Sequence, residues 1–199
     1  MTRHQRIRRN TLRAIFMAII ILQDFVPFFG NIPLGPLSIT TLHVTVILAA
    51  ITLGPGEGVT TGGTWGLLTW IRAFVAPSSP LAPLVFTNPL VAIFPRIMIG
   101  VVAGLLFRLV VRYSHSQRLA AILAAAAGAI TNTGLVLGMI YLFYQTPAVA
   151  HAYGVDVNHL LSALEAIMAT NGLAELILAV IVVPLIALPV LEVQRRLGQ

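Results

Sequence analysis

A single arginine, Arg96, stands inside one of the most apolar stretches of the chain, residues 86–107, "FTNPLVAIFPRIMIGVVAGLLF". An ionised arginine in the hydrocarbon core of a membrane costs about 2.5–3.5 kcal/mol on insertion scales, so it needs an anionic partner. Two alternatives are open. Arg96 forms a structural ion pair with Glu165 or Glu175, or it pairs with the carboxylate of a ligand, which the planar guanidinium matches bidentately.

The apolar helices of the chain carry few other polar side chains in the half of the bundle that contains Arg96. Arg72 is expected to reach the membrane surface or to hold a loop, because its long stem allows the charge to leave the apolar region. The set as a whole indicates a pocket for a small, mostly neutral acid. Its members are Gln23, Asp24, Asn31, Thr41, Thr45, Arg72, Asn88, Arg96, Asn132, Glu165, Asn171 and Glu175.

The composition indicates an all-α integral membrane protein. Of the 199 residues, 58% are hydrophobic and only 9% are charged, whereas a soluble domain has roughly a quarter charged residues. The chain contains no cysteine and no lysine. It therefore has no thiolate chemistry and no Walker A loop, so any ATP-driven work requires hydrolysis by another chain.

Long apolar runs predict six transmembrane helices in one membrane domain over residues 1–199, since each span needs about 20 apolar residues. Pairs of glycines four residues apart indicate close helix packing in the third, fourth and fifth. The expected helices cover residues 11–29, 37–53, 57–75, 88–113, 117–144 and 160–193.

The arginines predict the orientation of this bundle. With six spans, ten of the twelve arginines lie on one face, and only Arg72 and Arg96 do not. Arginines flank membrane helices on the cytoplasmic side, so both termini are expected to be cytoplasmic. The positive net charge is explained by topology and does not indicate nucleic-acid binding.

Other functional classes fit the sequence poorly. An intramembrane protease requires paired catalytic residues or a metal site on its helices, and His43, the only histidine expected inside a span, has neither a serine nor a second ligand beside it. A channel would show rings of like charges, and a secondary transporter would show inverted repeats. No catalytic residue, metal or cofactor is therefore expected.

The stretch from residue 25 to residue 100 resembles the substrate-binding S components of energy-coupling factor (ECF) vitamin transporters, most closely the pantothenate-specific members. The phrases "FVPFFGNIPLGPLSIT", "WIRAFVAPSSPLAPLVFTNP" and "PRIMIG" carry the resemblance. It implies a subunit that captures a vitamin outside a bacterial plasma membrane. Its partners would be a transmembrane T subunit and two cytoplasmic ABC ATPases, and the T subunit would dock on small residues of the first helix, matched here by Ala14 and Ala18.

The resemblance also implies roles for residues of the pocket. Arg96 would hold the carboxylate of pantothenate, while Asn132, Asn171 and Asn88 would bind its amide or hydroxyl groups. Trp65 and Tyr141 would contact its apolar part, and Phe28, Phe29 and Asn31 would form a lid. The alternatives are an S component for another vitamin, such as riboflavin or folate, and a structural or small-solute membrane subunit outside the ECF family.

Overall fold

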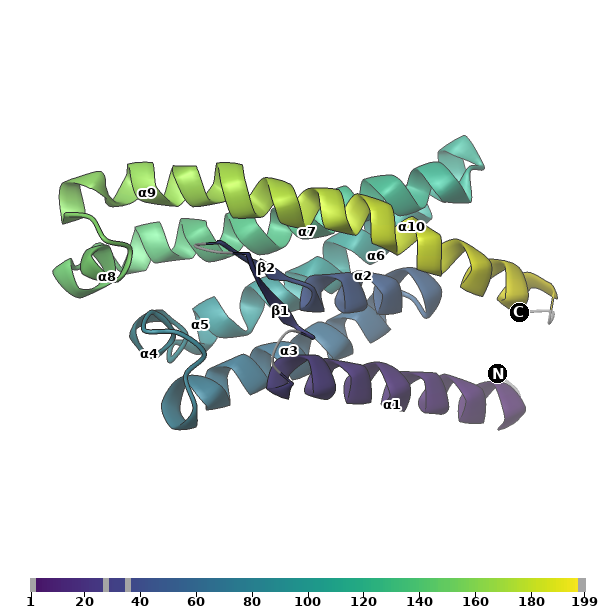
Figure 1. The fold of residues 1–199 in the computed structure, drawn as a ribbon. Coiled ribbons are helices and arrows are strands. Elements are labelled where there is room, and N and C mark those ends of the chain that lie inside the picture. The colour runs from purple at the N-terminus through teal and green to yellow at the C-terminus, as the bar shows by residue number, and fades with distance from the viewer. Residues whose placement is uncertain (1–2, 27–28, 35–36, 197–199) are drawn as a thin grey trace.

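The computed structural model describes residues 3–26, 29–34 and 37–196. It is an elongated bundle of helices in which α1 begins and α10 ends at the same end, with α4 and α8 at the opposite end (Figure 1). In chain order the elements are α1 (Arg3–Phe25), β1 (Asn31–Leu34), β2 (Leu37–Thr40), α2 (Leu42–Thr52), α3 (Pro55–Val75), α4 (Ala82–Val85), α5 (Pro89–Ala92), α6 (Phe94–Ser114), α7 (Gln117–Phe143), α8 (Pro147–Ala152), η1 (Val157–His159), α9 (Leu160–Ile167), η2 (Met168–Gly172) and α10 (Leu173–Arg196).

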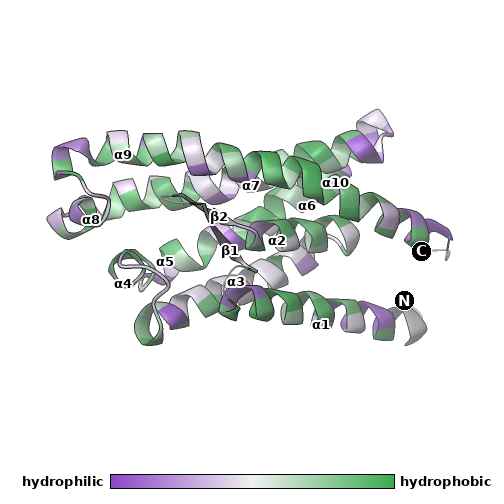
Figure 2. Ribbon diagram, in the orientation of Figure 1, coloured by the Kyte–Doolittle hydropathy of each residue, from purple (hydrophilic) through white to green (hydrophobic). Residues whose placement is uncertain are grey.

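The surface of the bundle fits a lipid environment. Three helical stretches are long and apolar enough to cross a membrane, namely Pro89–Ser114, Gln117–Phe143 and Val157–Arg196. Figure 2 shows that α10 is hydrophobic along most of its length. Many of its large apolar side chains are exposed, including Leu185 at 69%. A water-soluble bundle would bury such a stripe, so the structure agrees with the predicted helical membrane protein.

The prediction for the second helix is wrong at its start. That helix, α2, begins at Leu42, and the preceding residues Leu37–Thr40 form β2, which pairs with β1 in an antiparallel hairpin. Pairing with Asn31–Leu34 gives the backbone of Leu37–Thr40 hydrogen-bond partners in the hairpin in place of those of a helical turn. The apolar run that predicted a helix from residue 37 covers both β2 and α2, so it does not show where the strand ends and the helix begins.

Two other predicted helices are interrupted. The fourth is divided into α5 and α6 at Ile93, two residues before Pro95, whose ring cannot donate the next helical hydrogen bond. The sixth contains a π-helical segment, η2, between α9 and α10. Such segments often lie at functional sites, and η2 faces the cavity described below.

Helices α3 and α6 approach so closely that glycine on one helix lies against the backbone of the other. A Cβ atom at Gly100 would lie 2.2 Å from the backbone carbon of Gly58, and one at Gly62 would lie 2.1 Å from the carbonyl oxygen of Arg96. The predicted glycine packing is therefore confirmed for this pair of helices. It is wrong for Gly134 and Gly138 in α7, where an added Cβ would meet no atom within 4 Å.

Candidate functional site

A cavity of about 380 Å³ lies between the hairpin, α1, α3 and η2. Its volume is within the range of small-molecule sites, roughly 300–1,000 Å³. Its wall combines charged, hydroxyl, amide and aromatic side chains from segments distant in the sequence. The lining residues are Gln23, Asp24, Gly30, Asn31, Thr40, Leu42, Trp65, Thr69, Arg72, Ala73, Ser78, Ser79, Leu81, Ala82, Phe86, Arg96, Tyr153, Ile167 and Asn171.

The proline beside Arg96 explains how the arginine is held. Pro95 has no amide hydrogen, so it cannot donate to the carbonyl of Val91, four residues earlier. The Arg96 side chain takes that place, because its Nη1 donates to the Val91 carbonyl at 2.9 Å. The break between α5 and α6 therefore provides an acceptor that fixes one edge of the guanidinium, and Gly62 leaves room for the Arg96 backbone.

The guanidinium of Arg96 is buried between aromatic rings and lacks a carboxylate partner. Its side chain is 6% exposed, and its central carbon lies 4.9 Å from the ring centroid of Trp65 and 5.1 Å from that of Phe86. Within the described chain no carboxylate is placed within 4.0 Å of it. The ring faces stabilise the cation, but they do not neutralise it.

The two glutamates considered as structural partners are engaged elsewhere. Glu175 accepts hydrogen bonds from the Thr40 amide at 2.9 Å and from the Thr133 hydroxyl at 3.1 Å. Glu165 is exposed on α9. The structure therefore contradicts a permanent ion pair between Arg96 and either glutamate.

Arg72, which was expected to reach the membrane surface or to hold a loop, lines the cavity. Its Nη1 lies 3.0 Å from the Asp24 carboxylate and also donates to the Asp24 backbone carbonyl. The Phe25 ring centroid lies 5.3 Å from its central carbon. Asp24 neutralises Arg72, so the lining residues, with two arginines and one aspartate, keep one positive formal charge. Glu175 lies outside this lining and attracts Arg96 without contacting it.

Of the other residues predicted for the site, Trp65, Asn171 and Asn31 line the cavity. Phe29 is 66% exposed, and its carbonyl accepts a hydrogen bond from the Thr41 hydroxyl at 2.7 Å. Phe28 lies outside the described residues. Of the two predicted lid residues that the structure describes, Asn31 lines the cavity and Phe29 does not.

Three predicted contacts are placed elsewhere. The side chain of Asn88 caps α5, where it accepts a hydrogen bond from the Leu90 amide at 2.9 Å. Tyr141 packs beside a separate apolar cluster that includes Ile140. Asn132 is 7% exposed in α7, and in the described part of the chain its side-chain oxygen accepts no hydrogen bond. None of the three is among the described residues that line the cavity.

Several wall residues were not predicted as ligand contacts. Tyr153 follows α8, and burial raises the pKa of its phenol to about 12, so the hydroxyl stays neutral and can donate a hydrogen bond near neutral pH. Gln23, Ser78 and Ser79 add further polar groups. Asp24 and Arg72 carry opposite charges and lie in the last turns of α1 and α3, so the sequence contained a signal for their pairing.

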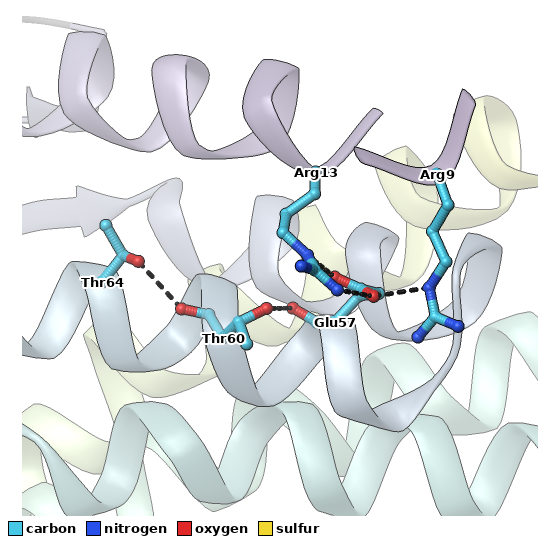
Figure 3. A network of polar contacts seen from close by, with 5 residues as sticks. All are labelled: Arg9, Arg13, Glu57, Thr60 and Thr64. Carbon is cyan, nitrogen blue, oxygen red and sulfur yellow. Dashed lines mark hydrogen bonds and ion pairs between the residues drawn. The ribbon is translucent and has the colours of Figure 1, made fainter. Parts of the chain in front are cut away.

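At the end of the bundle away from the cavity, a second ion-pair cluster joins α1 to α3. Glu57, which is 1% exposed, accepts hydrogen bonds from Arg9 Nε at 2.7 Å and from Arg13 Nε and Nη2, both at 2.6 Å. Figure 3 shows both arginines pointing from α1 to this one carboxylate. Together with Arg72 and Asp24, the cluster fixes α1 to α3 near both ends.

On the opposite side of α1, the small residues Ala14 and Ala18 form a strip on the outer surface of the bundle. Ala14 and Ala18 are exposed, and Leu22, one turn further, is 57% exposed. These alanines therefore do not serve packing within the described bundle. Their exposure leaves a smooth strip along α1 that a second helix can approach closely.

Comparisons with known proteins agree with this architecture. Residues 8–187 match the family described as ECF transporter, substrate-specific component. The chain is 34% identical over 194 residues to the pantothenate transporter PanT of Leuconostoc mesenteroides subsp. mesenteroides, with 94% of each chain covered. It is 35% identical over 181 residues to the pantothenic acid transporter PanT of Lactococcus lactis subsp. cremoris, covering 84% of this chain and 86% of that one. The chain belongs to the family of substrate-specific components of ECF transporters.

Proposed function

We propose that this chain is the pantothenate-binding subunit of an ECF-type importer. The observation that carries the proposal is the buried Arg96 guanidinium, which lines the cavity and has no carboxylate within 4.0 Å in the described chain. A buried cation of this kind is stabilised when an anion enters beside it. Both PanT relatives carry pantothenate or pantothenic acid in their names, and that molecule has one carboxylate.

The cavity wall matches the remaining groups of pantothenate. The ligand carboxylate pairs with Arg96, which balances the single positive charge of the wall. Asn171, Asn31 and Tyr153 supply donors and acceptors for the amide and the two hydroxyl groups. The rings of Trp65 and Phe86 contact the gem-dimethyl group. Asn88, Asn132 and Tyr141 lie away from the cavity and are left out of the proposed site.

The same proposal includes the membrane, the orientation and the partner subunits of the protein. The chain forms one domain with six spans in a bacterial plasma membrane, and both termini are cytoplasmic, as the arginine distribution predicts. The cavity then opens toward the outside. The strip around Ala14 and Ala18 docks on a transmembrane T subunit, and two ABC ATPase subunits hydrolyse the ATP that this chain cannot bind.

The test compares two ligands that differ in one group. Isothermal titration calorimetry of the purified chain is expected to show tight binding of pantothenate and much weaker binding of pantothenol, in which a neutral hydroxyl replaces the carboxylate. Riboflavin and folate serve as control vitamins. Equal affinity for pantothenate and pantothenol would contradict the role of Arg96, and tighter binding of a control vitamin would contradict the assigned substrate.

A further inference from the structure

The hairpin of β1 and β2 contributes Asn31 and Thr40 to the cavity wall, so its position determines whether the wall is complete. On the side of α1, hydrogen bonds at its base hold it in place. The Thr41 amide donates to the Gly30 carbonyl at 2.9 Å, and the Thr41 hydroxyl accepts a weaker bond from Gln23 at 3.3 Å. These bonds do not connect the hairpin to α10, so a separate contact must hold it on that side.

Glu175 of α10 makes that contact. One carboxylate oxygen accepts the backbone amide of Thr40 at 2.9 Å, and the other accepts the hydroxyl of Thr133 on α7 at 3.1 Å. The carboxylate is 6% exposed, and it is not among the described residues that line the cavity. Hydrogen bonds to an ionised group are about twice as strong as neutral ones, and low-dielectric surroundings strengthen them further.

We propose that Glu175 is a positioning residue that holds the hairpin side of the cavity wall against α7 and α10 and thereby slows ligand release. It acts through Thr40 without touching the ligand. An apolar residue at position 175 would leave the Thr40 amide, which is partly buried, without its acceptor. A glutamine can still accept from the Thr40 amide and donate to the Thr133 hydroxyl, but without the negative charge both hydrogen bonds are weaker.

The neighbouring π-helical segment connects this contact to the ligand. Asn171 of η2 lines the cavity and precedes Glu175 by four residues, about one helical turn. Gly172 packs against Thr133, since a Cβ there would lie 3.2 Å from the Thr133 Cγ2 atom. One short stretch of backbone thus carries both a wall residue and the carboxylate that holds the hairpin.

The experiment compares Glu175→Gln with Glu165→Gln, an exposed glutamate of α9 that serves as the matched control. Hydrogen–deuterium exchange of the full chain in lipid nanodiscs, without ligand, is expected to be about tenfold faster at the Thr40 amide in Glu175→Gln, because a neutral hydrogen bond replaces a charge-assisted one. The control is expected to exchange like the wild type. Thr133→Val, which removes only one contact, is expected to give a smaller increase.

Release of pantothenate gives the second readout, and this part depends on the proposed function. Stopped-flow measurement is expected to show a dissociation rate about tenfold higher in Glu175→Gln and an association rate near that of the wild type. Wild-type exchange at Thr40 in both Glu175→Gln and Thr133→Val would overturn the inference. If the wild type itself does not bind pantothenate, the substrate assignment fails, while the exchange measurement still decides the role of Glu175.

Discussion

Neutralising Arg96 is expected to weaken ligand binding without destabilising the empty protein. Arg96→Gln removes the charge and keeps a polar side chain in a site that is 6% exposed. Loss of one partner of a buried, hydrogen-bonded charge pair costs about 2–5 kcal/mol. At about 1.4 kcal/mol for each factor of ten, the dissociation constant for pantothenate should rise roughly 30-fold to several thousand-fold.

The stability of the empty protein is expected to change in the opposite direction. Without ligand, the direct contacts of the guanidinium within the described chain are the Val91 carbonyl and two aromatic rings, and Glu175 and Asp24 attract it only from a distance. Its burial is therefore a cost that the neutral side chain avoids. The melting temperature of the apo protein should therefore be equal or higher in Arg96→Gln. A purely structural arginine would give a lower value.

Calorimetry with pantothenate and thermal unfolding of the apo protein decide the question together. Arg112→Gln is the matched control, because Arg112 is an exposed arginine in the last turn of the same helix. Arg96→Lys should recover little affinity, since an ammonium group lacks the planar fork. Unchanged affinity in Arg96→Gln, or a melting temperature that falls together with the affinity, would refute the reasoning.

Three further changes test other parts of the structure. Glu57→Gln should lower the free energy of unfolding by about 1–2 kcal/mol, because its arginine partners are partly solvated, and denaturant titration that shows no loss would contradict a stabilising cluster. Gly100→Ala should cost about 1–3 kcal/mol through its clash with Gly58, and a melting temperature equal to that of the wild type would show that the helices can separate freely. Ala14→Leu or Ala18→Leu should leave pantothenate binding intact and reduce co-purification with a T subunit; wild-type recovery of the complex would count against docking on this strip.

The sequence predicts the long helices well because their apolar runs end at residues with clear physical roles. Helix α7 begins at Gln117 as expected, directly after Ser116, whose side chain caps it. Helix α3 ends at Val75 as expected, before a stretch rich in proline and serine. The hairpin was missed because Leu37–Thr40 is as apolar as a helix, and its pairing with β1 depends on contacts that composition does not encode.

The cavity was predicted less completely than the helices. Arg96 stands out because an isolated charge in an apolar run is costly wherever the chain folds. Asn88 and Asn132 look equivalent to Asn171 in sequence, since each is an amide within or beside an apolar run. Their placement in the fold separates them, because Asn171 lies on η2 at the cavity, Asn132 lies in α7 and Asn88 caps α5. Tyr153 depends on the path of a loop, which periodicity does not determine.

The cluster around Glu57 has a consequence for the order in which the protein is assembled. Arg9 and Arg13 are separated from Glu57 by 48 and 44 residues, so they leave the ribosome well before their partner does. The ion pairs that join α1 to α3 therefore cannot form until the chain has been synthesised as far as Glu57. A chain that stops after α2 ends before Glu57, so it lacks the carboxylate that both arginines contact and the connection that this cluster makes between α1 and α3.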